Sequence, residues 1–367
     1  MTATGRIALL FGGRSVEHEV SVTSARSVAR AFESTRFTCV PIAVAGDGRW
    51  LAPGPSAAVL ADTERKRVDD GALPDAPTVV LEPGAGLIER TPTGLRAVEI
   101  DAAFPLVHGW GGEDGRLQGA LETASIPYVG PDVLGSAVAM DKAVARTLFE
   151  AQGLDVAPWL VLRDGTPRDG IVERLGLPLF VKPANGGSSV GITRVARESE
   201  LPGAIDRAFG CDRKVVVERG IDAREIECAV LGNDEPRASV IGEIAPSREF
   251  YDYAAKYLEA GSRLFVPSDL EGRLGAEVRR RALAAFRALD LRGLARVDFL
   301  VERSTERIYL NEVNSLPGFT PISMFPMLWE ASGLPYPKLV ESLVELALER
   351  SRQDRRLRTR LQAEDVR

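Results

Sequence analysis

The sequence predicts a mixed α/β protein (α/β with α+β parts), and two kinds of pattern support this class. Near the amino end, short apolar segments are followed by glycine-rich turns and helical segments, an order typical of parallel α/β units. Farther along, alternating segments follow one another across short polar turns, which predicts antiparallel hairpins. The chain has 367 residues, which at roughly 100–200 residues per domain corresponds to two or three domains.

Composition and charge indicate an ordinary globular protein. Hydrophobic residues make up 45% of the chain, and its net charge of −6 argues against nucleic acid or an anionic membrane as a main partner. We find no signal peptide and no apolar run near the roughly 20 residues of a membrane span, so we expect a cytoplasmic protein. The 3 cysteines lack CxxC spacing and are expected to be buried, reduced thiols, and 2 histidines are too few for a multi-histidine metal site.

The first strand, turn and helix are predicted at residues 6–11, 12–15 and 16–32. A helix that follows a glycine turn presents open backbone N–H groups, although the GxGxxG fingerprint of dinucleotide-binding folds is absent. Glu17, His18 and Glu19 fall in the first helical turn. The helix dipole favours acidic residues there, but a glutamate at the mouth of a parallel sheet could instead hold a substrate ammonium group. The position alone leaves both roles open for Glu17.

Further strands are predicted at residues 37–44 and 101–108, with a helix at 116–124. The glycine-rich loop before this helix carries Glu113 and Asp114. It lies at the carboxyl end of a strand, where open α/β sheets bind ligands. Residues 46–98 are rich in Gly, Pro, Asp and Arg, and we expect a peripheral excursion there, with weak strands near residues 78–81 and 86–89.

A phosphate-binding pattern follows. A predicted helix over residues 137–152 carries Lys142, and a predicted strand over 177–183 ends with Lys182 and a proline. The Gly/Ser loop at 184–191 then leads to a short strand at 192–195. Such a loop offers backbone N–H groups to phosphate, and because no Walker A motif is present we expect a lid over a triphosphate rather than a P-loop. The alternative is an ordinary hairpin with a solvated Lys182.

The remaining elements are strands at residues 214–218, 224–231 and 238–244, helices at 274–289 and 338–349, and a charged tail at 350–367 to which we assign no chemistry. Glu218 stands at a strand end beside a turn, where a nucleotide base could be hydrogen-bonded. Residues 250–258 form an aromatic segment with Lys256. This segment fits either a mobile active-site loop or a short amphipathic helix.

Residues 293–323 combine two alternating segments around a polar turn at 304–307, which predicts a hairpin. If it forms, Asp298 lies near Glu312 and Asn314 on one face. Carboxylate and amide oxygens are hard ligands that suit magnesium. Arg296 points the same way and could stabilise charge on a transferred group, and the Pro-Gly turn after the second strand could aim backbone N–H groups at the same point. The alternative is a solvated hairpin with scattered charges.

Eight segments together resemble the ATP-grasp superfamily and, within it, the D-alanine–D-alanine ligases. They occur in the order of that family and extend to about residue 325. They are FGGRSVEHEVS (11–21), HGWGGEDGRLQGALE (108–122), MDK (140–142), VKPANGGSSVG (181–191), VVVERGIDAREIECAVLGND (215–234), YDYAAKY (251–257), RVDF (296–299) and NEVNSLPGFTPIS (311–323).

The resemblance implies an ATP-grasp fold of three domains, which we place at residues 1–130, 131–221 and 222–367. It also implies synthesis of D-alanyl-D-alanine for peptidoglycan through an acyl phosphate, with ATP, D-alanine and two magnesium ions, for which manganese could substitute. A cytoplasmic homodimer is the assembly that the resemblance implies. The alternatives are an ATP-grasp ligase with another acceptor, such as D-serine or D-lactate, and a non-catalytic nucleotide-binding protein on the same fold.

The resemblance also implies roles for individual residues. For the nucleotide and metal these are Lys142 and Lys182 on the phosphates, Glu218 and Ile221 at the adenine, Glu225 at the ribose, Lys256 on the closing loop, and Asp298, Glu312 and Asn314 as magnesium ligands. For the first D-alanine, they are Glu17 on its ammonium group, Ser188 and Tyr257 beside Glu17, and His108 near the substrate. For the second D-alanine, they are Leu316–Gly318 and Ser323 at its carboxylate. Arg296 and the backbone N–H of Gly318 would stabilise the tetrahedral oxyanion. Tyr257 favours D-alanine over D-lactate as acceptor. Trp110 and Phe319 depart from the family's commonest pattern.

Overall fold

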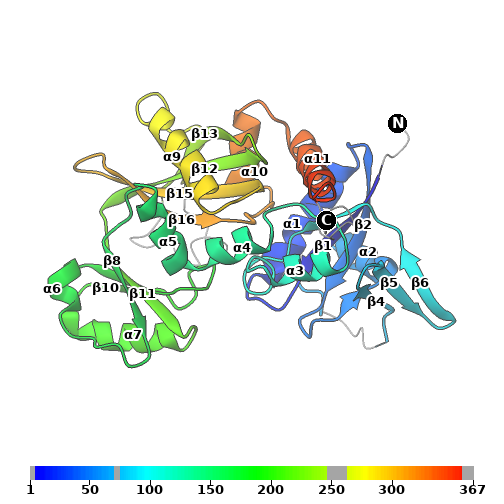
Figure 1. Ribbon diagram of the computed structural model, residues 1–367, viewed down its shortest axis with the longest axis horizontal. Coiled ribbons are helices and arrows are strands. Elements are labelled where there is room, and N and C mark those ends of the chain that lie inside the picture. Colours follow the sequence, from blue (N-terminus) through cyan, green and yellow to red (C-terminus); the bar gives the residue numbers. More distant parts are fainter. Residues whose placement is uncertain (1–4, 70–74, 246–262, 358–367) are drawn as a thin grey trace, which may run out of the picture.

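A computed structural model describes residues 5–69, 75–245 and 263–357 of the chain, in which three sheets form (Figure 1). The mixed α/β class is therefore confirmed. The predicted division into residues 1–130, 131–221 and 222–367 places one sheet in each part and stays a prediction. No helix in the described ranges is both long and apolar enough to cross a membrane. Lys256 and Tyr257 lie outside the described residues.

The N-terminal sheet is mixed rather than purely parallel. Strand β1 pairs in parallel with β2 on one side and β7 on the other. These elements and the helix between the first two have the bounds β1 (Gly5–Gly12), α1 (His18–Phe32), β2 (Phe37–Val44) and β7 (Ala102–Pro105). These bounds confirm the predicted strand, glycine turn and helix. Strand β1 is apolar because a strand in a parallel pairing is usually buried on both faces.

Residues 46–98 are not a peripheral excursion, and that prediction is wrong. Four strands there continue the N-terminal sheet in antiparallel order beside β2. The elements are β3 (Trp50–Leu51), α2 (Pro53–Ala61), β4 (Thr78–Glu82), β5 (Gly86–Thr91) and β6 (Gly94–Val98). The two weak strands near residues 78–81 and 86–89 are confirmed. Sheet membership was missed because β3 is very short and β6, although mostly apolar, lacks the alternation of polar and apolar residues that indicates a strand.

The helix predicted over residues 137–152 is wrong, because two helices meet at Asp141. The backbone of Asp141 is extended, and the Asp141 carboxylate accepts hydrogen bonds from the N–H groups of Ala143 and Val144, both at 3.1 Å. Asp141 also forms an ion pair with Lys214. It therefore ends one helix and caps the next. The helices in this part are α3 (Arg116–Thr123), α4 (Val133–Met140) and α5 (Lys142–Ala151).

The central sheet is antiparallel, in the order β10-β9-β11-β8, and lies at the lower left of Figure 1. Its elements are β8 (Trp159–Arg163), α6 (Ile171–Leu175), β9 (Leu179–Pro183), β10 (Thr193–Val195), α7 (Leu201–Phe209) and β11 (Lys214–Arg219). Strands β9 and β10 pair in antiparallel order across the Gly/Ser loop, so the predicted succession of strand, loop and strand is confirmed, whereas its role as a lid over a triphosphate stays a prediction. After α7 lies Cys211, which is exposed, against our expectation of a buried thiol, whereas Cys228 is buried.

The third sheet has five antiparallel strands in the order β14-β13-β12-β15-β16. Its elements are β12 (Ala223–Gly232), β13 (Arg237–Ala245), β14 (Arg263–Phe265), α9 (Gly275–Ala288), β15 (Gly293–Glu302), β16 (Ile308–Asn314), α10 (Met324–Ala331) and α11 (Tyr336–Asp354). On β12, Cys228 and Val230 belong to the core that includes α9, whereas Ala229 and Leu231 belong to the core that includes α10. Helices therefore cover both faces of this sheet.

One apolar core joins the N-terminal sheet to the five-stranded sheet. Phe319 lies within it, fully buried, with its ring centroid 5.6 Å from that of Phe104 and 5.5 Å from that of Phe325. Edge-to-face and tilted aromatic pairs at this spacing are favourable beyond the area that they bury. Phe319 is thus a packing residue between two sheets.

The first residue of the predicted charged tail, Arg350, belongs to a helix and has a structural role that we did not predict. Helix α11 continues through it to Asp354, and the Arg350 side chain is buried. Its guanidinium donates hydrogen bonds to the backbone carbonyls of Tyr128 and Gly130. These carbonyls lie just before the predicted boundary at residue 131, so Arg350 ties the C-terminal helix to the end of the N-terminal part.

We predict that Arg350→Ala lowers the free energy of unfolding by about 3 kcal/mol, because two charge-assisted hydrogen bonds are lost and two buried carbonyls are left unpaired. Arg352→Ala, in the same helix but at an exposed position, is the control and should change it by less than about 0.5 kcal/mol. Chemical denaturation of both variants measures the difference. Equal stabilities would show that the buried contacts of Arg350 contribute nothing.

Candidate active site

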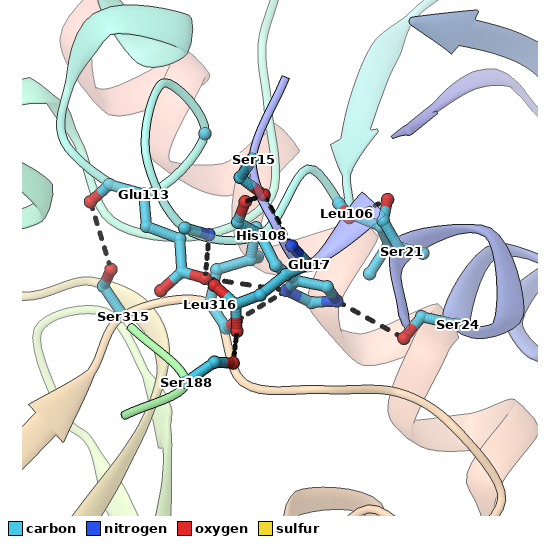
Figure 2. A network of polar contacts seen from close by, with 12 residues as sticks. Ser15, Glu17, Ser21, Ser24, Leu106, His108, Glu113, Ser188, Ser315 and Leu316 are labelled. Atoms are coloured by element: carbon cyan, nitrogen blue, oxygen red, sulfur yellow. Dashed lines mark hydrogen bonds and ion pairs between the residues drawn. The ribbon is translucent and has the colours of Figure 1, made fainter. Parts of the chain in front are cut away.

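Side chains from the three sheets meet at one place through three polar contacts. Ser188, in the Gly/Ser loop, donates a hydrogen bond to Glu17 at the start of α1. The ring nitrogen Nδ1 of His108 lies 3.2 Å from the backbone carbonyl of Leu316. The Lys142 ammonium lies 3.5 Å from Glu312. Figure 2 shows the first two contacts, so residues far apart in the sequence lie close together here, and their roles in a common site stay predictions.

Glu17 occupies the N-cap position of α1 but does not cap it. Its side chain makes no capping hydrogen bond, and its Oε1 accepts from the Ser188 hydroxyl instead. A Cβ atom added at Gly109 or Gly187 would lie 2.4 Å or 2.8 Å from the other carboxylate oxygen. Two loops therefore approach Glu17 closely because they carry glycine there. Of the two roles left open by the sequence, the geometry favours a carboxylate that faces a ligand.

The Gly/Ser loop has an unusual backbone at its tip. Ser188 and Ser189 have φ values of 48° and 59°, in the left-handed region that non-glycine residues seldom adopt. Such conformations cost of order 1–3 kcal/mol each and are concentrated at ligand-binding sites. The backbone is held in a shape that turns the Ser188 hydroxyl toward Glu17.

The two lysines predicted for phosphate binding come from neighbouring elements. Lys142 begins α5, and its ammonium group donates to the carbonyl of Gly186 at 2.7 Å. Lys182 lies on β9 and forms an ion pair with Glu218 on β11. Both lysines are only 8% exposed. Buried ammonium groups beside a Gly/Ser loop present a positive surface to which a polyphosphate can bind.

Glu218 differs from our expectation. Its buried carboxylate is paired with two cations, Lys182 and the fully buried Arg146, rather than directed at an open site. Burial raises the pKa of Glu218, but Arg146 and Lys182 outweigh it and hold the pKa below its ordinary value. Arg146 was not predicted. It lies four residues after Lys142 and thus on the same face of α5, a spacing that could have signalled it.

The predicted acidic hairpin forms, and its strand pairing shifts by one residue between Asp298 and Phe299. Asp298 lies opposite Glu312, and Arg296 lies opposite Asn314. The Arg296 guanidinium donates to both oxygens of Asp298, at 2.8 and 2.7 Å, and the Asn314 amide donates to Asp298 at 2.8 Å. The prediction that these side chains share one face is confirmed.

Glu227 is an acidic partner that the sequence analysis missed. It lies on β12 opposite Asp298, and its carboxylate is 3.0 Å from Nε of Arg296. Burial lowers the pKa of Arg296, but Asp298 and Glu227 more than compensate and raise it well above its ordinary value. Glu227 alternates with apolar residues along β12, and this pattern could have placed it on the hairpin's polar face.

The hairpin's donor set fits a magnesium ion that also contacts phosphate. In the described ranges, no group of three or more His, Cys, Asp or Glu side chains is placed to hold a metal by itself. Asp298 and Glu312 supply two carboxylates, and Asn314 can present its amide oxygen by rotating the amide group. Magnesium commonly takes only one or two carboxylates and completes its shell with water and substrate phosphates. The residues therefore fit such an ion.

The turn after the hairpin leads into α10. Ser323 stands at the N-cap of α10, and its hydroxyl accepts from the Thr320 N–H at 3.0 Å. A Cβ atom at Gly318 would lie 2.8 Å from the Ser323 hydroxyl, so a residue with a side chain would crowd the turn. The open N–H groups and the dipole at a helix N-terminus favour a carboxylate. This geometry is compatible with the predicted binding of a substrate carboxylate.

His108 is buried and surrounded by acceptors. Burial lowers its pKa, but the carboxylates of Glu113 and Glu17 more than offset this and raise the pKa above its ordinary value. The ring nitrogen Nδ1 is 3.6 Å from Glu113, which itself accepts from the Gly109 N–H at 2.8 Å. Glu113 thus orders the glycine-rich loop, a role that the sequence did not assign to it.

Two predicted nucleotide contacts lie at the start of the third sheet. Ile221 is in the connection between β11 and β12, half-buried, and Glu225 is on β12 opposite Leu300 of β15. Both roles stay predictions. They nonetheless lie one short connection away from Glu218 and therefore from Lys182.

Family profiles match both parts of the chain. The profile of the D-ala D-ala ligase N-terminus matches residues 6–131, and that of the D-ala D-ala ligase C-terminus matches residues 148–345. The chain is 48% identical to D-alanine–D-alanine ligase A of Chromobacterium violaceum over 96% of this chain and 97% of that protein. It is 46% identical to the D-alanine–D-alanine ligase of Heliobacterium modesticaldum over 95% of this chain and 96% of that protein.

Solved structures agree with these matches. The D-alanine-D-alanine ligase from Coxiella burnetii superposes with a TM-score of 0.82 at 35% identity, covering 96% of this chain and 97% of its own. The VanG D-Ala:D-Ser ligase from Enterococcus faecalis gives a TM-score of 0.81 at 34% identity, covering 93% of this chain and 99% of its own. The similarity therefore extends over all three sheets.

We predict that Arg146→Met destabilises the protein by roughly 3–5 kcal/mol, because removing one partner leaves a buried carboxylate with less compensation. The double variant Arg146→Met with Glu218→Gln should recover part of this loss, since the buried carboxylate is then neutral. The recovery is only partial because Lys182 loses its ion pair with Glu218. Denaturation of both variants in parallel measures the effect. If the double variant is no more stable than the single one, the buried charge of Glu218 is not the cause.

Proposed function

The chain belongs to the D-alanine–D-alanine ligase family, and we propose that it joins two D-alanine molecules in an ATP-dependent reaction that passes through an acyl phosphate. It is an ATP-dependent ligase with ATP and D-alanine as substrates. Its product, D-alanyl-D-alanine, serves peptidoglycan precursor synthesis. The observation that carries the assignment of its site is the meeting of Glu17, Lys142 and the acidic hairpin at one place.

In the first step, the carboxylate of one D-alanine attacks the γ-phosphate of ATP, and ADP leaves. We assign to Glu17 the substrate ammonium and to Lys142 and Lys182 the phosphate oxygens, because a buried carboxylate and two buried ammonium groups face the same region. Little covalent chemistry is required of the protein in phosphoryl transfer, so positioning and charge compensation do most of the work. Magnesium at Asp298, Glu312 and Asn314 would supply further compensation of phosphate charge.

In the second step, the amine of the other D-alanine attacks the acyl phosphate, and phosphate leaves. The carboxylate of this second D-alanine is assigned to Ser323 and the N-terminus of α10. The backbone N–H of Gly318 and the guanidinium of Arg296 are assigned to the tetrahedral oxyanion, where each donor contributes roughly 3 kcal/mol in comparable sites. Arg296 can serve because its ion pairs with Glu227 and Asp298 engage Nε and Nη2 of a group with five N–H donors.

The remaining assignments complete the nucleotide site. We place adenine at Ile221 and the backbone beside Glu218, since the Glu218 carboxylate is occupied by cations. Ribose is assigned to Glu225. Lys256 and Tyr257 are assigned to a loop that closes over the acyl phosphate, which water would otherwise hydrolyse. A cytoplasmic homodimer that uses two magnesium or manganese ions is the form we propose.

The first experiment is release of ADP by the purified protein with ATP, magnesium and D-alanine. D-serine, D-lactate and L-alanine are compared, each paired with D-alanine. We expect turnover with D-alanine alone and detection of the dipeptide by mass. Turnover only with a second acceptor would move the protein to the group of ligases with another acceptor. No turnover with any pair, from protein that binds ATP, would contradict ligase activity.

Glu312→Gln should lower kcat by at least roughly a hundredfold, because one carboxylate of the proposed metal site loses its charge. Glu302→Gln, in the same hairpin but at its far end, is the matched control and should keep near-normal activity. Initial rates over a series of magnesium concentrations measure the effect. Near-normal activity of Glu312→Gln would remove Glu312 from the metal site.

A further inference from the structure

Two side chains of the N-terminal part hold both ends of the turn that contains Gly318. The carbonyl of Leu316, at the start of this turn, lies 3.2 Å from Nδ1 of His108. The N–H of Phe319, at its end, donates to the hydroxyl of Ser24 at 3.3 Å. The same hydroxyl lies 3.3 Å from Nε2 of His108. Figure 2 shows His108 between Ser24 and Leu316.

The direction of these hydrogen bonds follows from the groups themselves. A backbone carbonyl can only accept, so Nδ1 of His108 carries the proton that points at Leu316. In the neutral ring Nε2 is then an acceptor, and the Ser24 hydroxyl donates to it while its oxygen accepts from the Phe319 N–H. When the ring is protonated, Nε2 donates to Ser24, whose oxygen has lone pairs for both donors. The connection across the turn therefore persists in either state of His108.

Burial makes this connection costly to break. Ser24 is fully buried on α1, and His108 is 3% exposed. The Phe319 side chain is fixed in the aromatic cluster with Phe104 and Phe325. If the Ser24 hydroxyl is removed, the Phe319 N–H loses its acceptor in a region without access to water, and a buried unpaired donor costs of order 1–3 kcal/mol. The turn would shift to recover a partner.

We propose that Ser24 is a positioning residue for the ligase reaction, which together with His108 clamps the Leu316–Phe319 turn and thereby aims the Gly318 N–H at the reacting carbonyl. The inference rests on the proposed function of Gly318 and adds a residue that does not contact substrate. Displacement of an oriented donor by about 1 Å can lower a rate by about a hundredfold. Ser24 therefore acts on the second step, through the backbone of the turn.

The chain offers a matched control on the same helix. Ser21 is also fully buried, and its hydroxyl accepts from the Gly12 N–H at 2.7 Å and donates to the Leu106 carbonyl. Its partners belong to β1 and to the residue after β7, not to the turn. Ser21→Ala and Ser24→Ala therefore remove equally buried hydroxyls with two backbone or ring partners, but only Ser24→Ala releases the turn.

The test compares both variants with the wild-type full-length protein in ADP release and dipeptide formation. Ser24→Ala is expected to lower dipeptide kcat roughly tenfold to a hundredfold, with the KM for ATP unchanged. Its ratio of ADP released to dipeptide formed should rise above one, because acyl phosphate that is not aminolysed is hydrolysed to D-alanine and phosphate. Ser21→Ala should lower the melting temperature without changing kcat or this ratio.

Ser24→Thr keeps the hydroxyl and should recover most of the coupling between ADP release and dipeptide formation. The proposal is overturned if Ser24→Ala and Ser21→Ala have the same kinetics, or if Ser24→Thr is as uncoupled as Ser24→Ala. Failure of the proposed function itself would be seen separately, as absence of dipeptide from the wild-type protein.

Discussion

The burial of Phe319 between two sheets is the contact on which the geometry of the active site depends. Its ring lies against Phe104 of the N-terminal sheet and Phe325 of α10, within a core that the two sheets share. Close-packed interiors resist displacement, so a shared core fixes the two sheets relative to each other. The turn that precedes Phe319 is thereby held against His108, and the N-terminal part of the protein contributes to the site as rigidly as the acidic hairpin does.

The central sheet is attached to this unit in a different way. It has an apolar core of its own, formed with α6 and α7. Near the site its Gly/Ser loop meets the N-terminal part through a polar contact, Ser188 with Glu17, and accepts a hydrogen bond at Gly186 from Lys142 of α5, a helix that packs in the core of the five-stranded sheet. Polar contacts can be exchanged for contacts to substrate at little net cost, because a bound phosphate or ammonium group replaces the lost partner. The site thus combines a rigid half with a half whose contacts ligands can replace.

Buried charges are arranged so that each cation lies beside carboxylates before any ligand arrives. Glu218 lies between Arg146 and Lys182, and Arg296 lies between Glu227 and Asp298. Such pairs contribute little net stability because desolvation offsets their attraction. They do keep the guanidinium and ammonium groups charged and oriented, and preorganised charge is what a reaction of phosphates and carboxylates requires. Burial of apolar side chains in the surrounding cores offsets the desolvation free energy of these charges.

The sequence by itself determined features that depend on neighbours along the chain. The hairpin followed from strand alternation, and the Gly/Ser loop followed from its composition. The shift in strand pairing between Asp298 and Phe299, which puts Asp298 opposite Glu312, is seen only in the structure. Only the tertiary structure decided that residues 46–98 extend the first sheet and that Asp141 divides two helices. It also decided that Arg146, Glu227 and Ser24 contact side chains of the predicted site. The physical reason is that a buried polar side chain is selected by its partner in space, and for Ser24 that partner lies 295 residues away.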